Sequence, residues 1–173
     1  MSSAAAEKPN FPVNVREATE ADIPTILRFI KDLAIYEKAE EEAQATPELL
    51  IENVFKKKYA HALICEDITN ANTPIGMALY FFSFSTWKGK PSLYLEDLYV
   101  DPSVRNRGAG KALFRALGKV AEENDCQRMD WSVLNWNAPS IAFYEKVLGA
   151  VPMKEWTQER LDLEGIHRLR SLK

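Results

Sequence analysis

Arg105-Asn106-Arg107-Gly108-Ala109-Gly110 is the stretch that decides the fold, because it joins a predicted strand to a predicted helix. The strand covers residues 92–100 and ends at Asp101-Pro102. The helix carries apolar residues at helical spacing, namely Ala112, Leu113, Ala116, Leu117, Val120 and Ala121. Glycine lets the backbone approach a ligand closely, and the unpaired N–H groups at the start of a helix favour an anion. The stretch therefore predicts a cradle for a diphosphate.

The glycine spacing separates this loop from two better-known phosphate motifs. A P-loop has four residues between its glycines and ends in Gly-Lys-Ser/Thr, whereas Gly108 and Gly110 are one residue apart. A dinucleotide fingerprint has a further glycine three positions on, where this chain has Leu113. What remains is Arg-x-x-Gly-x-Gly, and a tight strand-to-helix connection without a ligand stays the alternative.

Composition narrows the class of protein. The chain has 173 residues, of which 46% are hydrophobic and 27% charged, as expected for a single globular domain. We expect a disordered leader at residues 1–12 and one domain at residues 13–173. The net charge is −3 and the basic residues are scattered, apart from a short run at 56–58, which argues against a nucleic-acid partner.

Cysteine, histidine and hydropathy patterns exclude other kinds of site. Cys65 and Cys126 lie far apart in apolar contexts, so we expect neither a disulfide framework nor a covalent acyl intermediate on cysteine. His61 and His167 are isolated, so no metal site is expected. No run reaches the length of a membrane span and the first residues lack an apolar signal core, so we expect no membrane partner and a cytoplasmic location.

The remaining pattern predicts an α/β protein with a mixed, mostly antiparallel central sheet and helices on both faces. Asp22 is the expected N-cap of the first helix, with Pro24 in its first turn, and Thr46-Pro47 is expected to cap the second. Strands are predicted at residues 13–17, 60–66, 75–85, 92–100, 128–133, 150–153 and 159–163. Helices are predicted from about 23 to 37, 47 to 55, 108 to 121 and 137 to 148.

Three features together resemble the GCN5-related N-acetyltransferases (GNAT), over residues 13–173. They are this order of elements, the loop Arg105-x-x-Gly108-x-Gly110 and the motif Asn137-x-Pro139-Ser140-x-x-Phe143-Tyr144. Three runs look closer still to the diamine (spermidine/spermine-type) acetyltransferases, and these are Ile30 to Glu37, Tyr94 to Val100 and Trp136 to Tyr144. The resemblance implies the GNAT fold, acetyl-CoA as co-substrate, no metal, and transfer of acetyl to a primary amine of a small molecule. It also implies a homodimer.

The resemblance also implies which residues hold acetyl-CoA. The loop would bind the pyrophosphate through Arg105, Asn106, Arg107, Gly108, Ala109, Gly110 and Lys111. The backbone of Leu98, Tyr99 and Val100 would pair with the amide-rich pantetheine arm at a splayed strand edge. Asn137 and Ser140 would contact the cofactor, cap the helix they begin, or do both. An ordinary buried strand at 98–100 stays the alternative.

Two residues are expected to move protons. An amine with a pKa near ~10.4 arrives protonated and cannot attack, so a base must accept its proton. The family pattern gives that role to Glu96; a surface carboxylate is the alternative, and strand alternation points the neighbouring Asp97 to the opposite face. The pattern gives Tyr144 the role of acid toward the departing thiolate, although Tyr144 also fits a core stripe with Ile141 and Leu148. A backbone N–H near Leu98 would meet the oxyanion.

The substrate site is expected at Tyr36, Glu37, Glu96 and Glu155, by the same resemblance. Glu40, Glu41 and Glu42 would add an acidic rim that attracts a polycation, or form a solvated loop. A diamine, a polyamine and a lysine-like amine all stay open as acceptors. A protein or peptide lysine acetyltransferase is the alternative within the enzyme class, and a non-catalytic acyl-CoA-binding regulatory module is the alternative outside it.

Overall fold

The structure is a computed structural model that describes residues 12–172. The chain divides into two compact units, residues 1–132 and residues 133–173, and each is described by itself. Apart from Pro12, the predicted leader lies outside the described residues. Among them, no helix is long and apolar enough to cross a membrane.

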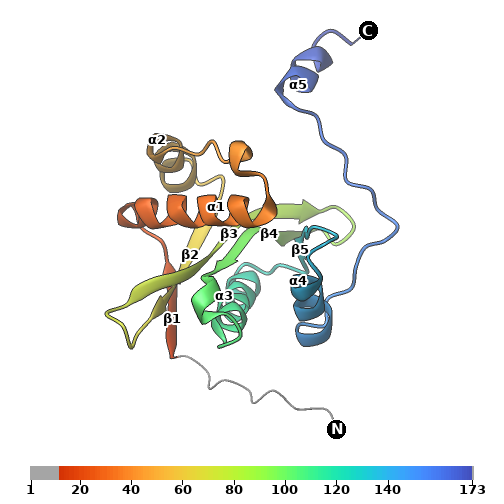
Figure 1. Cartoon of the computed structure of the whole chain (residues 1–173). Helices are drawn as coiled ribbons and strands as arrows, with labels where there is room; N and C mark the ends of the chain where they lie inside the picture. The colour runs from red at the N-terminus through yellow and green to blue at the C-terminus, as the bar shows by residue number, and fades with distance from the viewer. Residues whose placement is uncertain (1–11, 173) are drawn as a thin grey trace. The chain divides into compact units, whose positions relative to one another are not determined.

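The first unit contains a five-stranded sheet (Figure 1). Its strands are β1 (Val13–Glu17), β2 (His61–Asp67), β3 (Thr73–Ser85), β4 (Lys90–Val100) and β5 (Met129–Trp131). They lie in sequence order, and every neighbouring pair is antiparallel except β4 and β5, which are parallel. The prediction of a mixed, mostly antiparallel sheet is confirmed, and β1 lies at one edge of the sheet.

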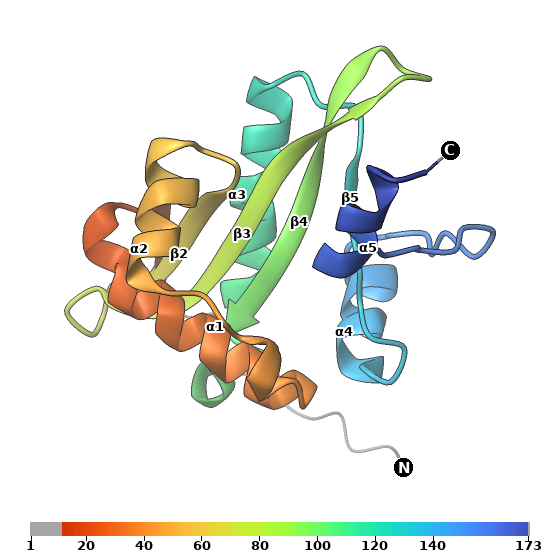
Figure 2. The ribbon, with the colours of Figure 1, turned by 90° about the horizontal axis from the view of Figure 1, so that it is seen from above.

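Helices cover both faces of this sheet. α1 (Ile23–Glu37) and α2 (Pro47–Leu50), with the π turn that continues α2 (Ile51–Lys56), lie on one face, and α3 (Ala109–Glu123) lies on the other (Figure 2). Thr46 caps α2 as predicted, since its Oγ1 accepts the Leu49 N–H at 3.3 Å. Short 3-10 turns cover Glu20–Asp22, Glu40–Glu42 and Pro102–Val104.

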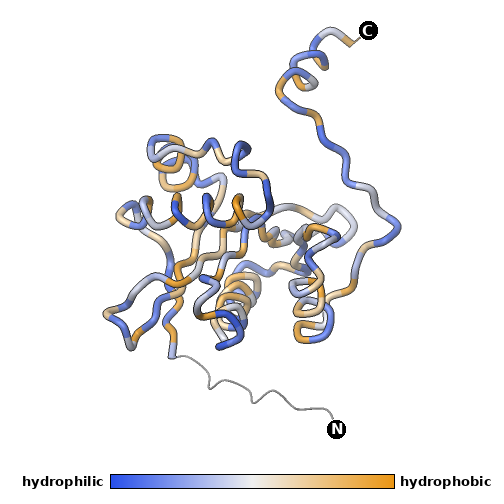
Figure 3. The backbone as a smooth tube through the Cα atoms, in the orientation of Figure 1, coloured by the Kyte–Doolittle hydropathy of each residue, from blue (hydrophilic) through white to orange (hydrophobic). Residues whose placement is uncertain are grey.

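The core on the α1 face joins the helix to three strands. Phe29 is fully buried and stacks on Tyr99 of β4, with ring centroids 4.7 Å apart. Polar and apolar residues alternate around α1 (Figure 3), so that one side of the helix packs and the other is solvated. Leu113 and Leu117 of α3 are fully buried on the opposite face. Burying each such side chain contributes about 1.5–3 kcal/mol, which fixes β4 between two packed layers.

Asp22 is the N-cap residue of α1, as predicted, but its side chain accepts no bond from the helix. Its oxygens accept bonds from Arg16 at 2.8 Å each and from the Thr19 N–H at 2.7 Å. The Arg16 guanidinium beside it lowers the pKa of Asp22 to about 2. A buried carboxylate takes the strongest available donor, here a bidentate arginine that ties β1 to the start of α1.

The second unit departs from the predicted pattern after its first helix. α4 (Ala138–Ala142) continues as a π turn (Phe143–Val147), and Gly149 follows with φ 75°. The strands predicted at 150–153 and 159–163 are absent from the described residues, where 150–162 form turns and irregular chain. The second prediction failed because Asp162 begins a helix, α5 (Leu163–Leu169), with its Oδ1 accepting the Gly165 N–H at 2.7 Å.

Candidate functional site

The predicted base, Glu96, lies at a β-bulge in the central strand. The register pairs Tyr80 of β3 with Leu95 and Leu79 with Asp97, so Glu96 is an extra residue with no partner across the ladder. A bulge bends its strand and redirects side chains, and bulges are frequent beside active sites. The expectation that Glu96 and Asp97 face opposite sides assumed unbroken alternation, which the bulge interrupts. Glu96 is exposed and Asp97 is partly buried.

Beyond this bulge, one edge of β4 has no strand partner among the described residues. β5 pairs with β4 only at Leu93, Tyr94 and Leu95. On the other side, Asp101 N–H donates to the Ile75 carbonyl at 2.8 Å, which identifies their register position as a hydrogen-bonded pair. Antiparallel pairs alternate, so the N–H and C=O groups of Leu98 and Val100 point away from β3.

Tyr99 differs from its two neighbours on this edge. By the same alternation its backbone groups face Met77 of β3, and its side chain is buried against Phe29. Its hydroxyl donates to Asp32 at 3.2 Å, and burial raises the pKa of Tyr99 to about 12. Tyr99 therefore holds the strand in the core, which leaves Leu98 and Val100 to offer backbone groups to a ligand.

The loop predicted to cradle a diphosphate forms a concave turn before α3. Asn106 has φ 62° and Gly108 has φ 96°, and Gly108 is the N-cap of the helix. Successive backbone N–H groups around such left-handed residues make an anion-binding concavity. Gly108 has no side chain that could cap the first turn, so the N–H groups there and the dipole of a 15-residue helix can favour an anion. The loop thus fits a diphosphate.

Three carboxylates gather at the bulge. Burial, together with the nearby charges of Glu96 and Glu37, raises the pKa of Asp97 to about 6. Burial also raises the pKa of Glu37, the last residue of α1. We call Glu37, Glu96 and Asp97 the acidic cluster. Sequence reasoning identified Glu37 and Glu96 but assigned Asp97 no role, although two adjacent acids near the end of a buried strand were a signal.

Tyr36, in the last turn of α1, contacts Arg105 of the phosphate loop. The Arg105 guanidinium lies 5.1 Å from the centroid of the Tyr36 ring, and its Nε donates to the Val100 carbonyl at 2.9 Å. Tyr36 thus contacts the loop, whereas its neighbour Glu37 belongs to the acidic cluster. Sequence reasoning had assigned both residues to the acceptor amine and Arg105 to the phosphates.

The other predicted site residues belong to the second unit. The Asn137 side chain accepts the Ser140 N–H at 3.4 Å, as a helix cap does. Tyr144 lies in the π turn, partly buried, with its ring centroid 5.7 Å from that of Phe143. Single π turns inside helices occur frequently at functional sites. Glu155 is exposed in the irregular segment after α4.

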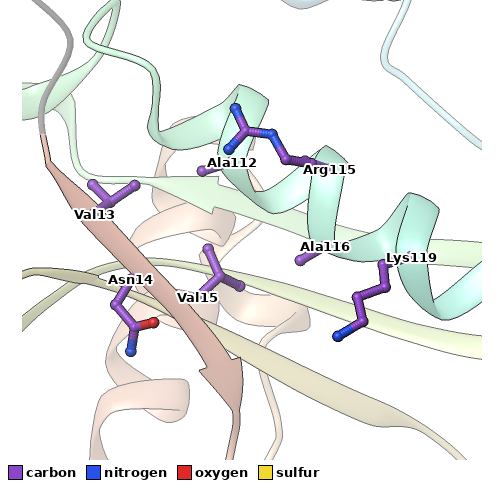
Figure 4. Close-up of a pocket in the computed structure, with 7 residues that line it drawn as sticks. All are labelled: Val13, Asn14, Val15, Ala112, Arg115, Ala116 and Lys119. Carbon is purple, nitrogen blue, oxygen red and sulfur yellow. The ribbon is translucent and has the colours of Figure 1, made fainter.

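A pocket elsewhere in the first unit contains none of these residues. It has a volume of about 240 Å³ and lies between β1 and α3 (Figure 4), lined by Val13, Asn14, Val15, Ala112, Arg115, Ala116 and Lys119. Among residues 12–172, no group of three or more His, Cys, Asp or Glu side chains could hold a metal.

The chain is similar to known acetyltransferases. Residues 27–150 match the profile of the acetyltransferase (GNAT) family. Thialysine N-epsilon-acetyltransferase of Bos taurus is 36% identical over 166 residues, which are 91% of this chain and 96% of that protein. Spermidine/spermine N(1)-acetyltransferase-like protein 1 of Homo sapiens is 31% identical over 135 residues, which are 75% of this chain and 19% of that longer protein.

A solved structure agrees with the architecture. An integron cassette protein of V. cholerae superposes with a TM-score of 0.75 at 24% identity, covering 92% of this chain and 98% of that one. At this identity the likeness bears on the fold alone.

Proposed function

Because the chain belongs to the acetyltransferase (GNAT) family, we propose that it transfers acetyl from acetyl-CoA directly to a primary amine of a small molecule. Glu96 serves the amine and Tyr144 serves the departing thiolate. The observation that carries this proposal is the acidic cluster beside the open edge of β4, where a cation and an extended amide-rich ligand can lie next to each other.

The acidic cluster suits an amine that carries more than one positive charge. Glu96 is the exposed member at the bulge, so it is the carboxylate that an incoming ammonium group can reach. It accepts the proton, directly or through water, and leaves the neutral amine that can attack. Asp97, with a pKa of about 6, is largely ionised at pH 7 and above. With Glu37 it attracts a second cationic group of the same substrate.

The phosphate loop and the edge of β4 hold the co-substrate. Bound acetyl-CoA supplies the thioester whose acetyl group is transferred. N–H groups of residues 106–111 bind its pyrophosphate. The outward groups of Leu98, together with the Val100 N–H, hydrogen-bond its amide-rich arm. We assign to the Leu98 N–H the oxyanion that develops on the thioester carbonyl.

Two further residues support direct transfer. Tyr144 matches the tyrosine of the family pattern, and its hydroxyl gives a proton to the CoA thiolate as it leaves. Cys65 is fully buried, and burial raises the pKa of its thiol to about 11, which makes it a poor nucleophile. An acetylated intermediate on Cys65 is therefore disfavoured.

The acceptor, the assembly and the location extend this proposal. The names of the relatives point to thialysine and to polyamines, which are small amines with several charged groups. We favour such a diamine, polyamine or lysine-like amine over a lysine side chain of a protein. By family resemblance, the chain works as a homodimer, and light scattering on the purified protein tests the dimer. The cytoplasmic location stays a prediction from the sequence pattern.

An amine panel tests the proposed function. The purified chain is incubated with acetyl-CoA and with thialysine, lysine, a diamine, spermidine or a lysine-containing peptide, and thiol release and product mass are measured. We expect turnover with one or more small amines and little with the peptide. Preferred turnover of the peptide would favour a protein acetyltransferase. Binding of acetyl-CoA without turnover on any amine would favour a regulatory module.

A matched pair of variants isolates the role of Glu96. Glu96→Gln should lower kcat by roughly a hundred- to ten-thousandfold, the range of general base catalysis. Glu52→Gln is the control, because Glu52 is a partly exposed glutamate of the π turn after α2 that pairs with Lys56 and Lys57. Equal activity of both variants would remove Glu96 from the mechanism.

A further inference from the structure

Two consecutive residues at the end of α1 contact different parts of the site. Glu37 belongs to the acidic cluster, where its charge acts on Asp97. Tyr36 lies against Arg105 at the start of the phosphate loop, 5.1 Å from ring centroid to guanidinium carbon. Neighbouring residues on a helix point about 100° apart, so the last turn of α1 lies between the amine side and the cofactor side.

Arg105 connects that turn to the open edge of β4. Its Nε donates to the Val100 carbonyl at 2.9 Å in a partly buried bond. This carbonyl is one of the outward groups of the edge, because Val100 and Gly76 form a non-hydrogen-bonded pair of the ladder. A planar guanidinium can donate in its plane while its face rests on an aromatic ring. Arg105 does both.

We propose that Tyr36 and Arg105 are positioning residues for acetyl-CoA, and that Tyr36 acts through its ring on Arg105 rather than on the amine. The inference rests on the proposed function, which assigns the co-substrate to this loop and edge. The Tyr36 ring holds the guanidinium, and Arg105 fixes the start of the loop to β4. Since Arg105 occupies the Val100 carbonyl, the edge offers the bound arm the Val100 N–H and both groups of Leu98. The arm must therefore present an acceptor opposite Val100.

Under this proposal, variants that remove the Tyr36 ring and variants that keep it should differ in their KM for acetyl-CoA. Tyr36→Leu should raise the KM for acetyl-CoA about two- to thirtyfold, which corresponds to the range of a cation–π contact, with the amine KM changed less than twofold. Tyr36→Phe keeps the ring and should rescue the acetyl-CoA KM. Tyr59→Leu is the control, because Tyr59 also has a lysine, Lys57, 6.0 Å from its ring but lies outside the site.

A truncated donor separates positioning from phosphate binding. S-acetylpantetheine has the amide-rich arm without the diphosphate. If Arg105 positions the edge, then Tyr36→Leu and Arg105→Lys raise the KM for acetyl-CoA and for S-acetylpantetheine by similar factors. The double variant should be little worse than either single one, because both remove the same interaction. If Arg105 acts only by its charge on phosphate, the KM for S-acetylpantetheine stays at the parent value, and the proposal is wrong.

Two more outcomes would overturn the inference. An increase in amine KM for Tyr36→Phe, at unchanged acetyl-CoA KM, would show that the hydroxyl contacts the amine. Parent values for both KM in a folded Tyr36→Leu variant would show that the ring has no role; thermal unfolding checks the fold. Turnover by the parent chain is measured first, so that failure of the proposed function itself is seen separately.

Discussion

Asp97→Asn should stabilise the chain at neutral pH, and the gain should shrink as the pH falls. Asp97 is partly buried beside two other carboxylates, and both burial and those charges disfavour its ionised form. Asparagine has nearly the same shape and carries no charge at any pH. The substitution therefore removes an unfavourable charge from the acidic cluster while the bulge is retained.

The size of the effect follows from the pKa of Asp97. A rise from 3.8 to about 6 is equivalent to roughly 3 kcal/mol. Partial exposure and relaxation lower this figure, so we expect about 1–3 kcal/mol at pH 7.5. Because the folded-state pKa is raised, the stability contributed by the protonated carboxyl is fully present below pH 3.8 and lost as the pH rises through about 6. The difference between variant and parent therefore grows over that window.

Urea unfolding between pH 5 and 8, followed by tryptophan fluorescence, measures this difference. Asp125→Asn is the control; it removes an exposed carboxylate that pairs with Lys90, an interaction that contributes little to stability. A constant difference for Asp97→Asn across this range would refute the reasoning. So would destabilisation that increases with pH. We also expect the variant to raise the KM for a dicationic amine more than that for a monoamine.

Three further substitutions test other parts of the account. Gly76→Ala would put a Cβ 2.7 Å from the Tyr99 carbonyl oxygen, so β3 and β4 must separate. We expect the free energy of unfolding in urea to fall by about 1–3 kcal/mol. Unchanged stability would contradict this close approach. Gly108→Val places a β-branched residue at φ 96° and should raise the acetyl-CoA KM in steady-state kinetics; an unchanged KM would dismiss the cradle. Tyr144→Phe should bind acetyl-CoA normally in calorimetry and lower kcat roughly a hundred- to ten-thousandfold, whereas an unchanged kcat would remove Tyr144 from the mechanism.

Sequence patterns predicted the first unit well because each of its elements carries local signals. These signals lie within a few residues of the helix and strand ends that they determine. They are Pro47, Gly108, the turn before β3 and the helical spacing after Gly110. The strand predicted at 159–163 failed because its apolar residues suggested a strand, whereas a capping aspartate at 162 begins a helix. The strand predicted at 150–153 lies in irregular chain.

The candidate site was only partly predictable for a related reason. The glycine loop and Glu96 lie in recognisable motifs, but the bulge at Glu96 appears only when β3 and β4 pair. The contact of Arg105 with Tyr36 and the electrostatic interaction of Asp97 with Glu37 join residues about 60 to 70 positions apart. Such contacts depend on how α1 crosses the sheet, and no spacing along the chain encodes them.

The most direct test of the central claim is the time course of CoA thiol release from acetyl-CoA by the purified parent chain, with and without thialysine. We expect release that depends on the amine, saturates with it and matches one acetyl group gained per amine molecule in the mass spectrum. Release that is the same with and without amine, or no release with any small amine, would contradict the account.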